Sequence, residues 1–576
     1  MNLKEQIRHS IPAAIVVVIG AWVMIYYSIV QWETMKPVPS WDLAIFSELA
    51  KAYAHFQTPI VPVKGDGYNL LGDHFHPILI LLGPIWRLFP TPLSLLITQD
   101  LLLAFSAWPL TRLASRLTNQ WVAGGLGLVY VLSWGMQGAV AAQFHEIAFA
   151  MPLLAYASVA FVERRWGAVT AWSVPLVLVK EDMGLTVLMI GVAVILTSAV
   201  PAWYRTCTVI RPGGRGADGL DTAGDAAGNS AGSAPQDDAA RNRRRGLRLG
   251  VGMIVGGIAA FLFAIQVFLP AFNINGVWDY GLSSQDQPTS PDALTQKATV
   301  VVMLILTSGI IGVTSPWLLV VLPTLAWRFL GPVEFYWVWD NWHYNATLMP
   351  IALGALLDVV ARRRAHGSYV ADHPVRQVGV DGRAVMGRSA QAALAAGATG
   401  EAGEAGTAGE SDVDGPRRRP TAFPTWLTVP MRHRFVVATS ILTAVATGVL
   451  TAPYLPLWQA TNKNFDPLAA EAKQSDEAQR TETHRVAVAH EVIATIPEGA
   501  TVVTDLSLLA YLVPRAEVSW AGTSGPDKEY IVMTPTSANQ WGSSDAAAWG
   551  KKHSKQGATY TLIYNKDNYQ IAKRNG

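Results

Sequence analysis

Long apolar runs alternate with short polar connections from the first residues of the chain to about residue 457. Most runs hold about 16–24 residues, the length a helix needs to cross about 30 Å of hydrocarbon. The pattern predicts a polytopic α-helical membrane protein with about 11 transmembrane helices. They are expected at residues 11–30, 93–110, 122–140, 147–162, 168–179, 184–200, 249–269, 299–313, 317–329, 346–361 and 435–452.

The segment 77–89 is shorter and contains Pro84 and Arg87, so we expect an amphipathic helix on the outer membrane surface. The first run lacks a small-residue cleavage site before Q-W-E-T, which predicts a retained helix. When the chain is threaded through the predicted spans, nearly every basic cluster falls on the same side of the membrane. We therefore expect a multi-pass plasma membrane protein with a cytoplasmic N-terminus and an extracytoplasmic C-terminus.

Two segments rich in Gly, Ala, Asp and Arg lack apolar periodicity and are expected to be disordered cytoplasmic inserts. After the last span, strand-like runs such as A-T-V-V-T-D and T-Y-T-L-I-Y predict a small extracytoplasmic α/β domain, interpreted as a lid or acceptor-positioning module. The predicted parts are 1–200, a transmembrane module with a long first outer loop at 31–92; 201–248, the first insert; 249–361, transmembrane helices with outer loops; 362–432, the second insert; 433–457, the last transmembrane helix; and 458–576, the α/β domain.

Composition narrows the function classes. The 44 Lys and Arg residues nearly balance 42 Asp and Glu residues, so we expect no nucleic-acid partner. Cys207 is the single cysteine, which excludes an internal disulfide framework and a Cys-rich metal site. The C-terminal region contains no G-x-G-x-x-G or phosphate loop, so a nucleotide-binding role has little support.

Ionisable and polar residues gather at the outer ends of the predicted spans. Ionisable groups there are costly to desolvate and are functional candidates. Because separate segments supply them to one side, we expect a single outward-facing cleft, although loops at a wet interface also tolerate charge. The candidates are Asp42, Glu48, Asp73, His74, His76, His145, Glu146, Lys180, Glu181, Asp182, Asp340, His343 and Tyr344, with Asp279, Tyr280 and Glu334 on the same side.

Several of these residues lie in runs that carry a family resemblance: W-D-L-A-I-F-S-E-L, G-D-H-F-H-P-I-L-I-L-L-G-P-I-W, F-H-E, L-V-K-E-D-M-G-L and H-Y-N-A-T-L-M-P. Together they resemble the membrane family called domain of unknown function 2079, over most of the membrane region and the C-terminal domain, less the two inserts. That family is similar to C-type glycosyltransferases, multi-span enzymes that take sugars from polyprenyl-phosphate carriers on the outer membrane face. The resemblance implies an inverting sugar transferase with a polyprenyl-phosphate-linked sugar donor and an envelope acceptor.

The resemblance also implies roles. Asp42 and His76-Pro77 stand where that superfamily places its essential acid and its Pro-containing motif, so Asp42 is the expected general base. Asp42 lacks the second, adjacent acid of protein mannosyltransferase relatives, which leaves the acceptor and the metal open. Lys180 is expected to bind the leaving phosphate, or else to snorkel beside an acid. His74, His76, His343 and Tyr344 are the other expected donor-binding residues.

Alternatives remain for G-D-H-F-H-P. His74, His76, His145 and Glu146 could ligate a divalent metal such as Mn, Mg or Zn. The histidines could also hydrogen-bond the phosphate or sugar, or only form the start of a helix at Pro77. The loop 272–296 is a candidate lid over the donor.

Three rival functions follow from the same pattern. A transporter or lipid flippase predicts mid-span ionisable residues and internal repeats. A non-catalytic envelope scaffold gives the outer polar residues no common task. A metallohydrolase has less support because H-E-x-x-H is absent from the sequence.

Overall fold

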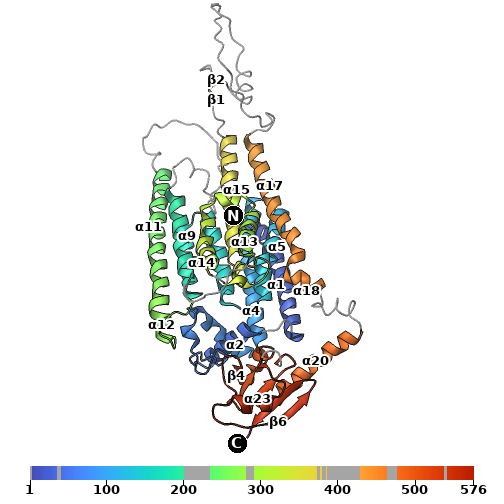
Figure 1. The fold of residues 1–576 in the computed structure, drawn as a ribbon. Helices are drawn as coiled ribbons and strands as arrows, with labels where there is room; N and C mark the ends of the chain where they lie inside the picture. Colours follow the sequence, from blue (N-terminus) through green and yellow to red (C-terminus); the bar gives the residue numbers. More distant parts are fainter. Residues whose placement is uncertain are drawn as a thin grey trace, which may run out of the picture.

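The computed structural model describes residues 3–35, 40–199, 234–280, 291–331, 333–372, 377–378, 384–385, 429–462, 476–537 and 541–576. A bundle of apolar helices occupies most of the molecule, and a small sheet domain lies at one end of it (Figure 1). The first helix starts toward the opposite end (Figure 1). The helices of the bundle are α1 (Leu3–Glu33), α4 (Pro92–Leu117), α5 (Gln120–Val131), α6 (Trp134–Ala141), α7 (Ala150–Val162), α8 (Trp166–Ser173), α9 (Met183–Ala199), α11 (Ala234–Phe263), α12 (Leu269–Phe272), α13 (Ala293–Thr307), α14 (Leu322–Leu330), α15 (Leu348–Asp372) and α17 (Val429–Thr451).

Within the described residues, five helical segments are long and apolar enough to cross a membrane: Leu3–Glu33, Pro92–Leu117, Asp238–Phe272, His343–Ala365 and His433–Tyr454. Each of the other six predicted spans overlaps a shorter apolar helix or, at 122–140, the pair α5 and α6, which is interrupted at Leu132 and Ser133. The mostly helical character is confirmed. The count of about 11 spans stays a prediction.

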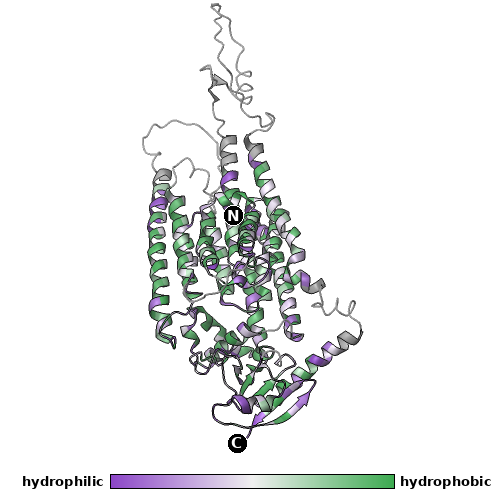
Figure 2. Ribbon diagram, viewed as in Figure 1, coloured by the Kyte–Doolittle hydropathy of each residue, from purple (hydrophilic) through white to green (hydrophobic). Residues whose placement is uncertain are grey.

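Burial separates the helices into inner and outer ones. The segment His343–Ala365 is almost entirely buried, whereas Asp238–Phe272 and His433–Tyr454 are largely exposed on the flanks of the bundle. These exposed faces are apolar, as Figure 2 shows along the helices of the bundle. Exposed apolar helices are favoured where lipid, not water, surrounds them, so the arrangement fits a membrane-embedded bundle.

The segment after residue 475 forms the predicted small α/β domain. Its sheet has the order β4 (Glu517–Trp520), β3 (Thr501–Thr504), β5 (Tyr530–Met533), β7 (Tyr569–Arg574) and β6 (Tyr560–Lys566). β4, β3 and β5 are parallel, and β7 and β6 form an antiparallel hairpin. Its helices are α20 (Asp476–Thr495), α21 (Leu509–Leu512) and α23 (Ala546–His553). The turn between β6 and β7 has positive φ at Asp567 and Asn568, as tight hairpin turns favour.

The two expected inserts differ in part from the prediction of disorder. α11 already begins at Ala234, so residues 234–248 are helical. Alanine, glutamine and arginine are good helix formers, and the adjoining span lets the helix continue. In the second insert, α15 extends to Asp372, and β1 (Gln377–Val378) pairs with β2 (Ala384–Val385). Residues 429–432 begin α17, and the rest of both inserts lies outside the described residues.

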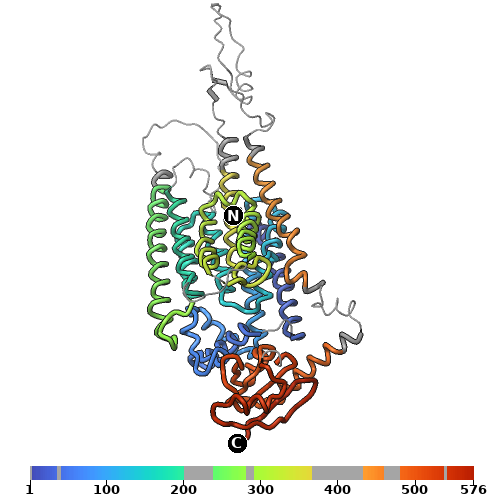
Figure 3. The backbone as a smooth tube through the Cα atoms, viewed as in Figure 1, coloured from blue at the N-terminus to red at the C-terminus, as the bar shows by residue number. Residues whose placement is uncertain are grey.

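The expected surface helix is present as the 3₁₀ turn η2 (Pro77–Leu81) followed by α3 (Leu82–Leu88). Arg87 Nη1 donates to the carbonyl of Ala54 at the end of α2 (Trp41–Ala54), 3.0 Å away. Ile80, Leu88 and Phe89 remain exposed. Figure 3 shows this part of the chain between the bundle and the C-terminal domain.

Candidate functional site

The start of α2 is fixed to the C-terminal domain. The backbone N–H of Ser40 donates to the carbonyl of Leu506 at 3.2 Å, and the Ser40 hydroxyl accepts from the N–H of Ala510 at 3.1 Å. α2 begins at the next residue and carries Asp42 in its first turn. The carboxylate of Asp42 is 41% exposed, whereas the acids of the neighbouring turns are nearly covered. Asp42 is therefore held in place at its backbone and open at its side chain.

Asp42 faces a cavity of about 750 Å³ between the end of the bundle and the C-terminal domain. Nine of the thirteen candidates line it, as does Tyr280; the nine are Asp42, Asp73, His74, His76, His145, Glu146, Lys180, His343 and Tyr344. They come from α2, from the loop after it, from the turns before α7 and α9, and from the start of the segment that contains α15. The structure thus places residues up to 302 positions apart in sequence around one cavity.

His145 is the described residue that pairs with Asp42. Its Nε2 lies 3.6 Å from Asp42 Oδ2, and its Nδ1 lies 3.2 Å from the carbonyl of Gln143. Since a carbonyl only accepts, Nδ1 carries a proton, and Nε2 can donate to the Asp42 carboxylate only from a doubly protonated ring. The N–H of His145 also donates to Gln99 Oε1 of α4 at 2.9 Å. His145 therefore has a fixed orientation toward the Asp42 carboxylate.

A second imidazole lies against His145. The ring of His343 stacks on it with centroids 3.6 Å apart. His343 Nδ1 is buried and has no hydrogen-bond partner among the described residues. A buried imidazole nitrogen without a partner is costly, which makes His343 available to a bound ligand in the cavity.

Lys180 supplies a cation to the cavity. Its Nζ lies 2.8 Å from Glu146 Oε1. Burial opposes the charged form, but the charges of Glu146, Glu181 and Asp182 outweigh it and hold the pKa of Lys180 well above its ordinary value. Lys180 is thus both paired with an acid and exposed to the cavity. Pairing with an acid and binding of a phosphate, the two roles expected from the sequence, are therefore compatible.

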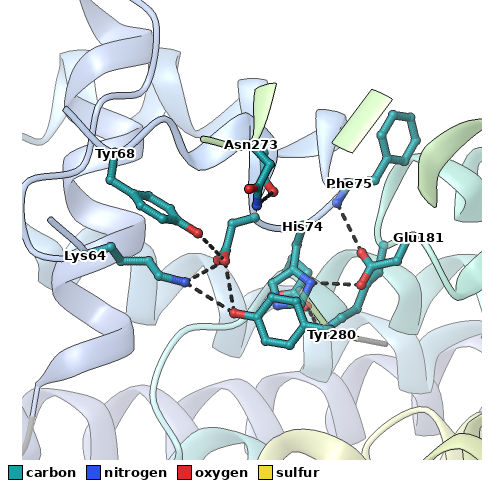
Figure 4. A network of polar contacts seen from close by, with 11 residues as sticks. Lys64, Tyr68, His74, Phe75, Glu181, Asn273 and Tyr280 are labelled. Carbon is teal, nitrogen blue, oxygen red and sulfur yellow. Dashed lines mark hydrogen bonds and ion pairs between the residues drawn. The ribbon is translucent and has the colours of Figure 1, made fainter. Parts of the chain in front are cut away.

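The G-D-H-F-H-P motif is held by the network in Figure 4. Lys64, Tyr68 and Tyr280 all contact Asp73 Oδ1, at 2.6, 2.8 and 3.0 Å (Figure 4). Burial raises the pKa of Asp73, but the charges of His74 and Lys64 and the hydrogen bonds outweigh it, and the pKa lies below its ordinary value. Asp73 therefore remains an anion that orients the second cavity lysine, Lys64.

The two histidines of the motif differ in charge. His74 Nδ1 lies 2.8 Å from Glu181 Oε1, and this carboxylate overcomes the effect of burial and raises the pKa of His74. Glu181 Oε2 also accepts from the N–H of Phe75 at 3.1 Å. For His76, burial lowers the pKa to about 4, so its ring is neutral at pH 7. His74 can carry positive charge to a bound anion, whereas His76 can only offer a neutral imidazole.

The possibility that His76 only starts a helix is supported in part. Pro77 is the first residue of η2, as expected, but the His76 side chain makes no capping hydrogen bond within the described part of the chain. Instead, the imidazole lines the cavity, and its ring lies 6.3 Å from the ring of Phe46.

Four expected site residues lie outside the cavity lining: Glu48, Glu181, Asp182 and Asp340. Glu181 contacts the Nδ1 atom of His74 and does not reach the cavity itself. Asp182 is partly buried, burial raises its pKa to about 6, and its Oδ1 has no hydrogen-bond partner among the described residues. Asp340 is partly buried, which raises its pKa. None of these three presents a carboxylate to the cavity in this structure.

Glu48 instead contacts the C-terminal domain. Its Oε2 accepts from the N–H of Val63 at 3.3 Å, and its Oε1 accepts from the N–H of Val518 in β4 at 3.4 Å. Burial raises the pKa of Glu48 to about 8, partly offset by these two hydrogen bonds. Glu48 therefore belongs to the interface between α2 and β4.

Raising the pH from 5 to 8 is expected to weaken this interface in the wild type and to leave it unchanged in Glu48→Gln. The pKa of about 8 in the folded state exceeds the ordinary value of 4.5, so the contribution to stability is full below pH 4.5 and declines toward pH 8. Hydrogen exchange of the Val63 and Val518 amides, compared between the two proteins at each pH, measures this. Glu517→Gln, at an exposed neighbouring position, is the control. Equal pH dependence in wild type and Glu48→Gln would contradict the assignment.

The loop proposed as a lid is described up to Tyr280 and again from residue 291. Its first part, the strap of residues 273–280, crosses the motif: Asn273 Nδ2 donates to the carbonyl of Gly72 at 3.0 Å, and the Tyr280 ring stacks on His74 at 4.2 Å. The backbone of the strap and that of Gly72 approach closely, because a Cβ on Gly72 would lie 2.4 Å from Asn273 N.

Gly72→Ala is therefore expected to displace the strap. The added methyl group overlaps backbone atoms and costs about 1–3 kcal/mol, so we expect a lower Tm and faster hydrogen exchange over 273–280. Gly125→Ala is the matched control, because a Cβ there meets nothing within 4 Å and alanine is favoured in a helix. The same loss of protection in both variants would show that the effect is not local to the strap.

The other wall of the cavity is aromatic and was not foreseen. Trp327, Phe335, Tyr336 and Trp342 line it beside Tyr344. Buried Arg328 holds this loop, since it donates to the carbonyls of Tyr336 and Tyr344 and to Asn345 Oδ1. An arginine with several donors in a fixed fork suits this task.

The alternative of a divalent metal at these residues finds no support in the described part of the chain. Within the described ranges, no group of three or more His, Cys, Asp or Glu side chains is placed to hold a metal ion. Of the four expected ligands, Glu146 pairs with Lys180, and His74 pairs with Glu181. The chemistry below is therefore derived without Mn, Mg or Zn.

The family comparison covers the part of the chain that carries the expected site residues. Residues 38–377 match the family model described as predicted membrane protein (DUF2079). This range includes all thirteen expected site residues, but the match ends before the C-terminal domain, so it does not support the expected extension of the resemblance there. No protein in the curated set matches the chain. Because the match spans more than half of the 576 residues, the chain belongs to the DUF2079 family of predicted membrane proteins.

Proposed function

We propose that the protein is a membrane glycosyltransferase that moves a sugar from a polyprenyl-phosphate carrier to a hydroxyl of an envelope glycan, lipid or protein. One observation carries this proposal: the same cavity joins an open carboxylate, Asp42, with the cations Lys64 and Lys180 and with His74, whose pKa is raised. A base for the acceptor hydroxyl and a cationic site for a leaving phosphate are the two groups that this transfer requires.

In the proposed reaction, Asp42 takes the proton of the acceptor hydroxyl while the hydroxyl oxygen attacks the anomeric carbon of the sugar. The new C–O bond forms as the bond from that carbon to the phosphate oxygen breaks, and the phosphate leaves with the bonding electrons. Lys180, Lys64 and His74 stabilise the charge of the phosphate, His343 donates to or accepts from the sugar or phosphate, and His145 lies beside Asp42. A single in-line displacement inverts the anomeric configuration.

The proposal includes a C-type glycosyltransferase fold with about 11 spans, a cytoplasmic N-terminus and an extracytoplasmic cavity. Contacts at the end of the bundle opposite the cavity support this orientation. There, Arg364 Nη1 donates to the carbonyl of Leu117 at 2.5 Å, Arg116 pairs with Glu163 at 2.5 Å, and His9 lies 2.9 Å from Ser115. Basic residues thus gather at one end, as cytoplasmic ends require.

A lipid flippase or transporter is the second candidate, and Asp100 favours it. This carboxylate is fully buried within α4, and an ionisable residue inside a span is the feature that transport requires. A scaffold that only binds a partner has less support, because it gives the cavity charges no task.

Deleting the gene and comparing the envelope glycans and lipid-linked sugars with those of the complemented strain tests the proposal. A transferase predicts that one sugar disappears from the envelope while its lipid-linked donor accumulates on the outer face. Accumulation of the donor on the inner face would support the flippase instead. An unchanged set of glycans and lipid-linked sugars would refute both and leave the scaffold.

A further inference from the structure

The C-terminal domain presents a particular edge of its sheet to the cavity. Leu506 follows β3, and Trp520 is the last residue of β4, and both line the cavity. β4 and β5 lie on opposite sides of β3. In open α/β sheets, ligands bind outside the carboxyl ends of the parallel strands, near the point where the strand order reverses. In this protein the carboxyl ends of β3 and β4, where such sheets bind ligands, therefore face the cavity that contains Asp42.

Several contacts hold the C-terminal domain in place. Lys51 Nζ donates to the carbonyls of Val513 and Ala516 at 2.7 and 3.0 Å. Thr523 Oγ1 donates to the carbonyl of Val63 at 2.7 Å, and Lys528 pairs with Asp66 at 2.6 Å. Because Asp42, Lys51, Val63 and Asp66 all belong to α2 and the loop after it, these contacts fix the domain as a wall of the cavity.

Two indoles meet on this wall. The rings of Trp41 and Trp520 lie 4.9 Å apart with planes at 73°, and both side chains are partly exposed. Trp41 directly precedes Asp42. The Trp520 Nε1 donor is buried and has no hydrogen-bond partner among the described residues. Packing alone does not favour an indole there, because its unpaired donor costs free energy that an apolar ring avoids.

We propose that Trp41 and Trp520 form the acceptor subsite and that the acceptor is a saccharide. This inference rests on the proposed function and selects the glycan among its acceptors. A sugar ring has an apolar C–H face that packs on an indole, while its hydroxyls at the rim remain free for hydrogen bonds. A ring on this wall brings a hydroxyl to Asp42, next to Trp41, and leaves the lysines to the donor phosphate.

Binding of mannotetraose and arabinotetraose to the purified full-length protein in nanodiscs, measured by saturation-transfer NMR titration, tests the subsite. We expect at least one of them to bind, and Trp520→Ala and Trp41→Ala each to weaken that binding about five- to tenfold. Gly522→Ala should also weaken it, since its Cβ would lie 2.3 Å from the Trp520 ring and displace it. Trp121→Ala, at a 90% exposed indole, is the matched control and should bind like wild type.

Asp66→Asn, at an acid outside the cavity lining, should bind the oligosaccharide like wild type. Normal binding by all three subsite variants would overturn the inference, as would failure of the wild type to bind either oligosaccharide. Equal weakening in Trp121→Ala would also count against it. If binding depends on Trp520 but the deletion strain keeps all its envelope sugars, the saccharide site stands and the transferase proposal falls.

Discussion

Asp42→Asn is expected to lower sugar transfer by about 10²- to 10⁴-fold, the contribution of a general base. The amide keeps the shape of the side chain but cannot accept the proton of the acceptor hydroxyl. Because the Asp42 carboxylate is 41% exposed and its pair with His145 is long, at 3.6 Å, we expect little change in Tm. The measurement is the rate of transfer from a synthetic polyprenyl-phosphate sugar by purified protein, with Tm recorded in parallel.

Asp66→Asn is the matched control for this variant. Asp66 lies in the same outer loop, its carboxylate is 64% exposed, and it pairs with Lys528. An exposed pair of this kind contributes about 0–1 kcal/mol, so transfer should stay within about twofold of wild type. Wild-type transfer by Asp42→Asn would refute the assignment of the base, whatever the control shows.

Lys180→Met is expected to have the largest effect on stability and to abolish transfer. It leaves the Glu146 carboxylate, whose side chain is only 3% exposed, as an unpaired buried charge, which costs about 3–5 kcal/mol. It also removes a cation from the site proposed for the leaving phosphate, worth about 10²- to 10³-fold in rate. Thermal unfolding in nanodiscs and the transfer assay measure the two effects separately.

The double variant Lys180→Met with Glu146→Gln separates structure from chemistry. It removes both charges, so most of the lost stability should return, while transfer should remain low. Lys180→Arg keeps the charge and should retain more transfer than either. If the double variant transfers sugar at the wild-type rate, Lys180 serves only as the partner of Glu146.

The sequence predicted the location of most cavity residues because basic residues sort loops to one side of a membrane. Once the loops of His74, His145, Lys180 and His343 share a side, few arrangements keep them apart in a compact bundle. The α/β domain was likewise predictable from its alternating strands and from its hairpin turn. The mechanism, by contrast, stays a proposal, because position alone does not identify a substrate.

Helix geometry explains why Asp42 and Glu48 separate. They are six positions apart on α2, which places them about 120° apart around a helix of 3.6 residues per turn. Asp42 therefore faces the cavity while Glu48 faces β4. The same geometry could have been applied to the sequence, had the start of α2 at Trp41 been known.

Other residues could not be found from local patterns. Lys64 and Tyr68 flank G-D-G, which reads as a surface turn, and their contact with Asp73 depends on positive φ at Gly65 and Gly67. Trp520 lies 479 positions after Trp41 in a strand that reads as ordinary sheet. The docking of a separate domain leaves no periodic signal in a single sequence, since its contacts involve backbone carbonyls such as those of Leu506 and Val513.

The bonds of Ser40 to Leu506 and Ala510 also set the time at which the cavity is completed. These contacts join positions 466 and 470 residues apart, so a ribosome can insert every helix of the bundle before the partner of Ser40 exists. During synthesis Asp42 lies in an incomplete cavity. One wall of the cavity includes Leu506 and Trp520, so it forms only after residues 506–520 have been made and have folded against α2. Under the proposed function, a partly synthesised chain therefore lacks one wall of its donor and acceptor site until the α/β domain has been made.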